Sequence, residues 1–399
     1  MLLGVAGMRT APSPGSNLRL LPTSPRRGEV KGQRASCVPS PQRGEGQGER
    51  AAHLVFCAAR KACAAVVPIL LVVLLGLGTA AAQSPTLDAV KKRGHLVCGV
   101  NTGLAGFAAP DDRGNWVGID VDFCRAVAAA IFRDGNKVRF VPLNAKERFT
   151  ALQSGEVDIL SRNTTWTMSR DTSLGLNFSG ILYFDGQAFM VRRALGLKSA
   201  SELKGASICV QSGTTNELNL SDFFASRGFT YRPVVYERLV EVLGAYASGR
   251  CDAFTTDSSQ LIAERTRLAD PEAHEVLPDL ISKEPLGPVV RQGDAVWSNI
   301  VRWTLFALIN AEELGVTQSN VEAMHRSDSP EIRRLLGTEG DFGKDIGLGS
   351  DWAVSILKAV GNYGETFERN LGQGSPLKIA RGRNALWTDG GLMYAPPVR

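Results

Sequence analysis

The sequence contains little of what a metalloenzyme or a nucleotide-dependent enzyme requires. It has four His in 399 residues, and those outside the N-terminal leader lie far apart, without the short spacing of zinc ligands: His95, His274 and His325. The acidic segment 111–122 lacks the alternating pattern of a calcium loop. Neither a Gly-x-Ser-x-Gly nucleophile elbow nor a Gly-Lys-Ser/Thr phosphate loop occurs. We therefore expect no metal and no cofactor.

Outside its N-terminus the sequence also lacks an excess of positive charge. The net charge of the whole chain is +5. Residues 1–82 hold ten Lys/Arg and three Asp/Glu, a charge of +7, which leaves −2 for residues 83–399. A nucleic-acid partner would need a basic surface on the folded part of the chain. The charge distribution therefore argues against nucleic-acid binding.

No apolar run reaches the roughly 20 residues that a membrane-spanning helix needs. The run from Ala64 to Leu77 is short, contains Pro68 and follows two basic residues, and "TAAAQ" then supplies small residues. These features are typical of a signal peptide, with cleavage near Ala82. The residue directly after that position is Gln83 and not Cys, so we expect a soluble periplasmic protein without a lipid anchor.

Residues 1–50 are rich in Pro, Gly and Arg, show no hydrophobic period and resemble no part of an export signal. Because no Met occurs between Met8 and Met168, we hypothesise that translation naturally starts near Leu54 or Val55, at a non-Met codon. Residues 1–82 are then a leader with a non-native upstream extension.

Four Cys remain after the leader, and an even count in an oxidising compartment favours two disulfides. Four buried thiols are the alternative. The four cysteines are Cys98, Cys124, Cys209 and Cys251.

Strands and helices alternate in the first part of the mature chain. Gly155 is expected to end one helix, and Asp120 to cap the start of another. The pattern strand–helix–strand–helix–strand predicts an α/β fold with a parallel sheet. The expected elements are strand 95–100, helix 118–132, strand 137–143, helix 145–155 and strand 157–161.

This pattern recurs in residues 206–259. The segment "QSGEVDILSRNTT" aligns with "ASGRCDAFTTDSS", so that Ser154, Gly155 and Asp158 match Ser248, Gly249 and Asp252, and Asn163 falls on Asp257. Two copies of one unit predict two α/β lobes. The hydroxyl-rich loops at the carboxyl ends of the strands would then line one cleft between the lobes.

Residues 87–315 resemble the extracytoplasmic solute-binding proteins of polar amino-acid ABC importers. The resemblance rests on "VGIDVDFCRAVA", "LQSGEVDILSRNTTWTMSRD", "VQSGTTNE" and "SGRCDAFTTD". "NYGETFERNLG" and "GLMYAPPVR" resemble its general L-amino-acid-binding branch. The resemblance implies a periplasmic-binding-protein type II fold without catalysis, in which two α/β lobes joined by a two-strand hinge hold the ligand in the cleft between them.

The implied lobes are residues 83–188 for the first part of lobe 1, 189–288 for lobe 2, and 289–399 for the return to lobe 1 with a C-terminal extension. The chain would cross between lobes near 187–191 and return near 285–291. Trp387 and Tyr394 suggest that the extension packs against the body.

The resemblance also implies a set of ligand-binding residues. Arg170 would hold the α-carboxylate of an amino acid through its planar guanidinium, and Asp257 would receive the α-ammonium. The alternatives without a role in ligand binding are a solvated Arg170 and an Asp257 that caps the following helix. The other residues implied are Asn163, Thr165, Thr214, Thr215 and Phe107.

One position departs from many relatives, which carry a large apolar residue at the start of the second helix. This chain has Asn144 and Ala145 there, which leaves side-chain space open and favours broad selectivity. The expected partners are an L-amino acid and inner-membrane ABC permease subunits, with the binding protein a monomer.

Two other functions use the same fold: a sensory binding protein that docks on a receptor, and a periplasmic dehydratase-like enzyme. An enzyme needs an additional general acid or base in the cleft. The candidates Asp257 and Glu217 both have binding or capping explanations, so we predict no catalysis.

The implied lobes also suggest how the cysteines pair. A bridge between lobes would restrain the hinge, so we predict Cys98–Cys124 in lobe 1 and Cys209–Cys251 in lobe 2.

Overall fold

The computed structural model describes residues 84–399. The predicted leader, its cleavage position and the proposed translation start lie outside this range. Among residues 84–399, no helix combines the length and the hydropathy needed to cross a membrane.

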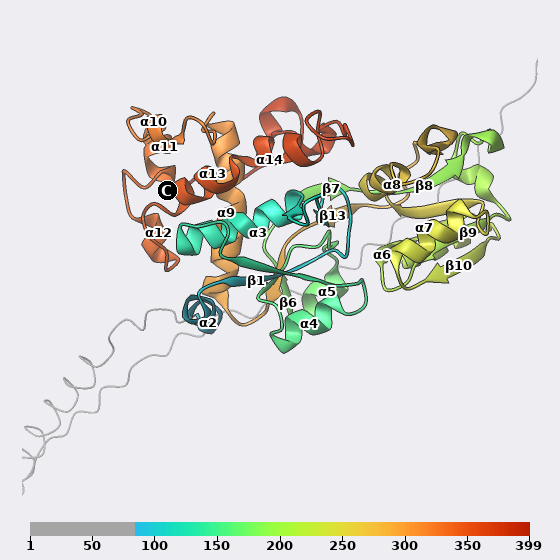
Figure 1. The fold of residues 1–399 in the computed structure, drawn as a ribbon, viewed down its shortest axis with the longest axis horizontal. Coiled ribbons are helices and arrows are strands. Elements are labelled where there is room, and N and C mark those ends of the chain that lie inside the picture. Colours follow the sequence, from blue (N-terminus) through green and yellow to red (C-terminus); the bar gives the residue numbers. More distant parts are fainter. Residues whose placement is uncertain (1–83) are drawn as a thin grey trace, which may run out of the picture. The chain divides into compact units, whose positions relative to one another are not determined.

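Two five-stranded sheets organise the chain (Figure 1). In each sheet three neighbouring strands are parallel, and the one of these three that comes first in the sequence lies between the other two. Beside them lies an antiparallel strand, and a further strand antiparallel to that one forms the edge. The first sheet has the order β4 (Val138–Pro142), β1 (Leu96–Val100), β5 (Ile159–Leu160), β14 (Val289–Arg291) and β6 (Leu176–Phe178). The second has the order β10 (Arg232–Tyr236), β9 (Ser207–Gln211), β11 (Ala253–Asp257), β8 (Gln187–Arg192) and β12 (His274–Val276).

Each sheet with its helices forms one lobe, so the fold is the two-lobed α/β type II fold that was predicted. The first lobe carries α2 (Pro85–Arg93), α3 (Ile119–Phe132), α4 (Arg148–Ser154), α5 (Met168–Ser173) and the C-terminal helices α9 (Ala295–Glu313), α10 (Val321–Met324), α11 (Pro330–Leu335), α12 (Phe342–Asp345), α13 (Trp352–Val360) and α14 (Tyr363–Asn370). The second carries α6 (Thr215–Ala225), α7 (Leu239–Ala247) and α8 (Ser258–Arg265). A small hairpin pairs β2 (Ala109–Pro110) with β3 (Trp116–Val117).

The short internal repeat corresponds to equivalent structural positions in the two lobes. Asp158 accepts a hydrogen bond from the Val97 backbone N–H at 2.8 Å, and Asp252 accepts one from the Ser207 N–H at 2.8 Å. In each lobe the carboxylate therefore holds the middle one of the three parallel strands, β1 in the first sheet and β9 in the second.

The hinge consists of β7 (Tyr183–Asp185) and β13 (Glu284–Leu286), which pair antiparallel to each other. The first crossing between lobes therefore precedes Gln187. Residues 187–191, near which the first crossing was expected, form part of β8 in the second sheet.

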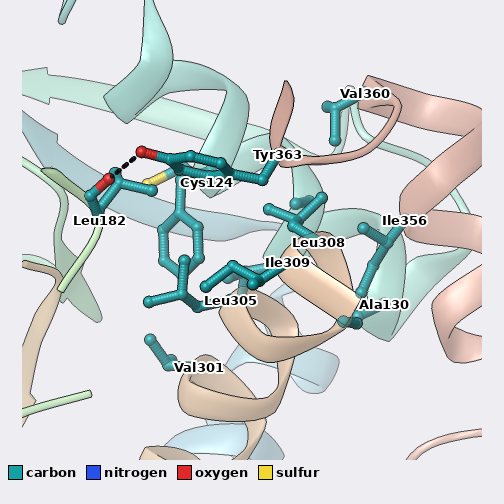
Figure 2. Close-up of a cluster of buried hydrophobic side chains, with 14 of the residues drawn as sticks. Cys124, Ala130, Leu182, Val301, Leu305, Leu308, Ile309, Ile356, Val360 and Tyr363 are labelled. Carbon is teal, nitrogen blue, oxygen red and sulfur yellow. Dashed lines mark hydrogen bonds between the residues drawn. The ribbon is translucent and has the colours of Figure 1, made fainter. Parts of the chain in front are cut away.

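The core of the first lobe packs apolar side chains of α3, α9 and α13 (Figure 2). From α14, Tyr363 is fully buried in this core, and its hydroxyl donates to the Leu182 carbonyl at 2.9 Å. The C-terminal extension packs as predicted, but through Leu386 and Met393. Trp387 and Tyr394 pair with each other and stay half-exposed.

Both predicted disulfides are present: Cys98–Cys124 joins β1 to α3, and Cys209–Cys251 joins β9 to the loop that precedes β11. Each bridge lies within one lobe, so neither restrains the hinge.

Candidate ligand-binding cleft

The polar loop that follows β5, residues 161–167, is held by hydrogen bonds to α3. Asp120 accepts hydrogen bonds from the Ser161 hydroxyl and from the Asn163 backbone N–H, both at 2.9 Å. Asn163 has a φ of +34°, a left-handed conformation that Asn tolerates better than most residues. Asp120 was expected to cap its helix, but the cap position belongs to Gly118. Asp120 points across to the loop instead, and burial raises its pKa to about 6.

Arg170 follows this loop, in α5, where the Thr167 hydroxyl caps the helix. It is only 8% exposed, so the solvated alternative fails. Its Nη1 donates to the Thr165 carbonyl at 2.9 Å, and its guanidinium lies 5.2 Å from the Phe149 ring centre. Burial lowers the pKa of Arg170, and the negative charges of Glu284 and Asp257 oppose this decrease. One of its five donors is thus engaged, which leaves donors for a planar anion.

Asp257 ends β11 in the second lobe and is 4% exposed. One of its oxygens, Oδ1, accepts from the Asn216 amide at 2.8 Å. Although Asp257 stands at the N-cap position of α8, its side chain makes no capping hydrogen bond, so capping does not explain it. Burial raises its pKa well above the ordinary range, and the charges of Asp185 and Glu284 raise it further.

Several contacts join the two lobes at these loops. The hydroxyls of Thr165 and Thr215 lie 3.3 Å apart, and the Asn163 amide donates to Gln260 of α8 at 3.3 Å. Lys146 pairs with Glu237 at 3.0 Å. The structure therefore brings Asn163, Thr165 and Arg170 of the first lobe close to Thr215 and Asp257 of the second.

Thr214 and Phe107 are placed differently from this group. The Thr214 hydroxyl donates to the Gln211 carbonyl at 2.7 Å and accepts from the Glu217 N–H at 3.3 Å, so it shapes the turn and caps α6. Phe107 is 1% exposed and packs edge-on against Tyr183, at 5.4 Å, in the first-lobe core. For both, contact with a ligand stays a prediction.

Three charged residues at the cleft were missed by sequence reasoning. Arg148 and Arg162 are buried, and burial lowers the pKa of each, that of Arg162 to about 10. Arg148 Nε has no hydrogen-bond partner among the described residues. Glu284 is 1% exposed at the start of β13. Nothing in the local pattern distinguishes these residues from surface charges; only a pairing of the hinge strands could have drawn attention to Glu284.

A cavity of about 390 Å³ has walls from both lobes. Its wall includes Asn144, so the position that lacks a large apolar residue does border free space. Polar and charged side chains from both lobes complete much of the wall, namely Thr102, Glu147, Gln211, Arg238 and Arg267. Among residues 84–399, no cluster of His, Cys, Asp and Glu is arranged to hold a metal ion.

Comparison with known proteins agrees with this architecture. Residues 96–320 match the family described as bacterial extracellular solute-binding proteins, family 3. The chain is 62% identical over 327 residues to the general L-amino acid-binding periplasmic protein AapJ of Rhizobium johnstonii, in a match that covers 82% of this chain and 96% of that protein. It is 55% identical to the glutamate/glutamine/aspartate/asparagine-binding protein BztA of Rhodobacter capsulatus, over 82% of this chain and 97% of that one.

A solved structure shows a similar level of sequence identity. The periplasmic binding protein of an ABC transporter from Brucella ovis, with glutathione bound, superimposes with a TM-score of 0.78 at 63% sequence identity. The match covers 79% of this chain and 100% of the Brucella chain.

Proposed function

This chain belongs to the bacterial extracellular solute-binding proteins of family 3, and we propose that it captures L-amino acids of many kinds in the periplasm and delivers them to an inner-membrane ABC permease. The observation that carries the proposal is the burial of both Arg170, in the first lobe, and Asp257, in the second. A buried cation of one lobe and a buried carboxylate of the other complement the two charges of a zwitterion.

The two charges explain why binding and closure form one event. Removing water from both charged groups of the ligand costs free energy, which fitted partners must offset. Arg170 belongs to the first lobe and Asp257 to the second, so only a closed cleft supplies both partners, and the ligand favours that state. We call Arg170 and Asp257 together the clamp. The clamp holds the groups that all α-amino acids share, and the cavity at Asn144 leaves room for different side chains.

The Brucella ovis structure adds a larger ligand to the proposal. Glutathione carries a free α-amino group and α-carboxylate on its γ-glutamyl residue, so the same clamp could hold that end. The rest of the molecule would extend into the 390 Å³ cavity. We therefore include glutathione among the expected ligands. Within this proposal the protein acts as a monomer, without cofactor or catalysis.

Calorimetric titration of residues 83–399 with the twenty amino acids and glutathione tests the proposal. We expect saturable heat at one ligand per chain for several amino acids, with the ligand recovered unchanged. Arg326→Ala, at an exposed site, serves as a matched control for Arg170→Ala. Absence of binding for every amino acid would overturn the proposal, and conversion of the ligand would favour the dehydratase-like alternative.

Uptake separates transport from sensing. In cells that carry the permease, deletion of this protein should abolish uptake of the ligands found by calorimetry, and the Arg170→Ala protein should not restore it. Unchanged uptake would favour a receptor-linked role.

A further inference from the structure

Glu284, on hinge strand β13, contacts residues of both lobes. Its Oε2 accepts from the Thr165 hydroxyl at 2.6 Å and from the Thr215 hydroxyl at 2.8 Å. Its Oε1 accepts from the Asn219 amide at 2.7 Å and from the Ser282 hydroxyl at 2.6 Å. One carboxylate thus contacts both lobes and the hinge.

Because of these four donors, Glu284 has no free lone-pair site with which to bind a ligand directly. A carboxylate has about four lone-pair sites, two on each oxygen, and each oxygen here accepts two hydrogen bonds from the protein. Glu284 is also 1% exposed. Any effect of Glu284 on the ligand must therefore pass through the groups that it holds.

The two threonine hydroxyls transmit such an effect because a hydroxyl has only one proton. Both protons are directed to Glu284, at 2.6 and 2.8 Å, whereas the two hydroxyl oxygens lie 3.3 Å from each other. Each hydroxyl then presents only lone pairs to its other neighbours. Two such oxygens, one from each lobe, attract a donor with several N–H groups and repel a carboxylate.

We propose that Glu284 is a positioning residue that turns Thr165 and Thr215 into acceptors, so that the clamp selects ligands that carry an ammonium next to the carboxylate. The inference rests on the proposed function, since it assigns these hydroxyls to the α-ammonium. It leaves the α-carboxylate to Arg170. The ammonium thereby donates hydrogen bonds to both lobes, to the two hydroxyls and to Asp257.

Glu284→Gln tests the proposal with a nearly isosteric side chain. The Asn219 amide donates at the Oε1 position and therefore favours the remaining oxygen there, so the introduced amide group would take the Oε2 position and donate to Thr165 and Thr215. Their protons would then be free to point toward the ligand. The probes are L-glutamate and glutarate, which is the same molecule without the α-amino group, and calorimetry gives both dissociation constants.

In the unmodified protein we expect glutarate to bind at least about 100-fold more weakly than L-glutamate. In Glu284→Gln this ratio should fall about tenfold or more, mainly through weaker binding of L-glutamate, as expected for loss of hydrogen bonds to a charged group. A ratio measured on one preparation is not altered by a fraction of misfolded protein. A merely structural role would change both constants together.

Two further variants separate hydroxyl polarity from the charge of Glu284. Thr215→Ser keeps the hydroxyl and should keep the ratio. In a Thr165→Val, Thr215→Val background, Glu284→Gln should change the ratio by less than about twofold; an undiminished effect there would assign it to charge alone and overturn the proposal. An unchanged ratio in the single Glu284→Gln variant would also overturn it, while leaving the proposed function intact. If the unmodified protein bound no L-glutamate, the ratio would be measured with another amino acid that binds and with the acid that lacks its α-amino group.

Discussion

The side-chain amide of Asn384 forms two hydrogen bonds with the backbone of Phe184: its Oδ1 accepts from the Phe184 N–H at 2.7 Å, and its Nδ2 donates to the Phe184 carbonyl at 3.1 Å. Phe184 is the middle residue of hinge strand β7, and Asn384 lies beyond the residues that match the family. Tyr363 holds the residue before the same strand, through the Leu182 carbonyl. The C-terminal extension is therefore attached to one of the two hinge strands.

Asn384→Ala should lower the free energy of unfolding by about 1–3 kcal/mol, because it leaves a largely buried N–H and C=O without their partners. Urea unfolding monitored by fluorescence measures this difference. Gln373→Ala, at an exposed position of the same extension, serves as the control and should stay within about 0.5 kcal/mol of the unmodified protein. Equal stabilities of the two variants would show that the Asn384 contact does not brace the hinge.

Arg170→Ala should weaken the binding of every amino acid by a similar factor, on the order of 100- to 1000-fold. The ligand carboxylate would be buried without its charge partner, a penalty of roughly 3–5 kcal/mol. Asp257→Asn should cost less, because the amide oxygen still accepts one hydrogen bond. Calorimetry with a neutral, an acidic and a basic amino acid measures these factors. A severe loss for one of the three with nearly normal binding of the others would mean that Arg170 recognises a side chain.

Ligand affinity should decrease as the pH is lowered from about 8 to about 5. Asp257 must be ionised to accept from the α-ammonium, and burial with two neighbouring carboxylates raises its pKa well above the ordinary value. Protonation therefore begins at a higher pH than the usual range of about 4 for a carboxyl group. A ligand such as L-alanine, whose side chain does not titrate, keeps both of its charges over this interval. Titrations at several pH values should show the decrease in the unmodified protein and a flatter profile in Asp257→Asn; identical profiles would exclude Asp257 as the titrating group.

The stability of the ligand-free protein should show the opposite trend. Burial raises the pKa of Asp120 to about 6 and that of Glu264 to about 7, so both groups bind protons more tightly in the folded state than in the unfolded chain. Their contribution to stability is complete below the unfolded pKa of about 4 and is lost as the pH rises through about 6 to 7. Thermal unfolding should therefore occur at a higher temperature at a pH of about 5.5 than at about 8. Glu264→Gln should reduce the difference; a difference of unchanged size would contradict this assignment.

Each disulfide should stabilise one lobe without being required for binding. Replacing Cys209 and Cys251 with Ala removes a cross-link that closes a separation of 42 residues, at a cost of about 3–4 kcal/mol. We expect lower resistance to urea with amino-acid affinity within a few-fold of normal, because neither cysteine lines the cleft. The corresponding change at Cys98 and Cys124 is the matched variant in the first lobe. Peptide mapping without reductant should recover only pairs within a lobe; a pair across lobes would contradict the structure.

Much of the framework could be predicted from sequence because it depends on local chemistry. The strand–helix alternation, the glycine stops and the match of Asp158 with Asp252 all describe short segments, and the structure contains them. Arg170 and Asp257 were accessible because their motifs are long and ordered. The burial of Arg170 and the absence of a capping hydrogen bond from the Asp257 side chain could be established only from the structure.

The features that escaped prediction depend on residues distant in sequence. Asp120 was assigned to its own helix, whereas it holds a loop 41 residues away. Glu284 resembles any charged residue before a proline until β13 is paired with β7, and Thr165 lies 119 residues away from it. An apolar segment such as 187–191 likewise does not reveal from its sequence which sheet it joins.

The strand order has a consequence for the sequence of events during export. All strands of the second sheet lie between Gln187 and Val276, whereas β6 of the first sheet pairs only with β14, at Val289–Arg291. A chain that emerges from its N-terminus thus has the whole second sheet available first. The lobe that contains β1 is then the last to be completed, and a chain that stops before residue 289 would leave β6 without its partner among residues 84–399 and the core without α9.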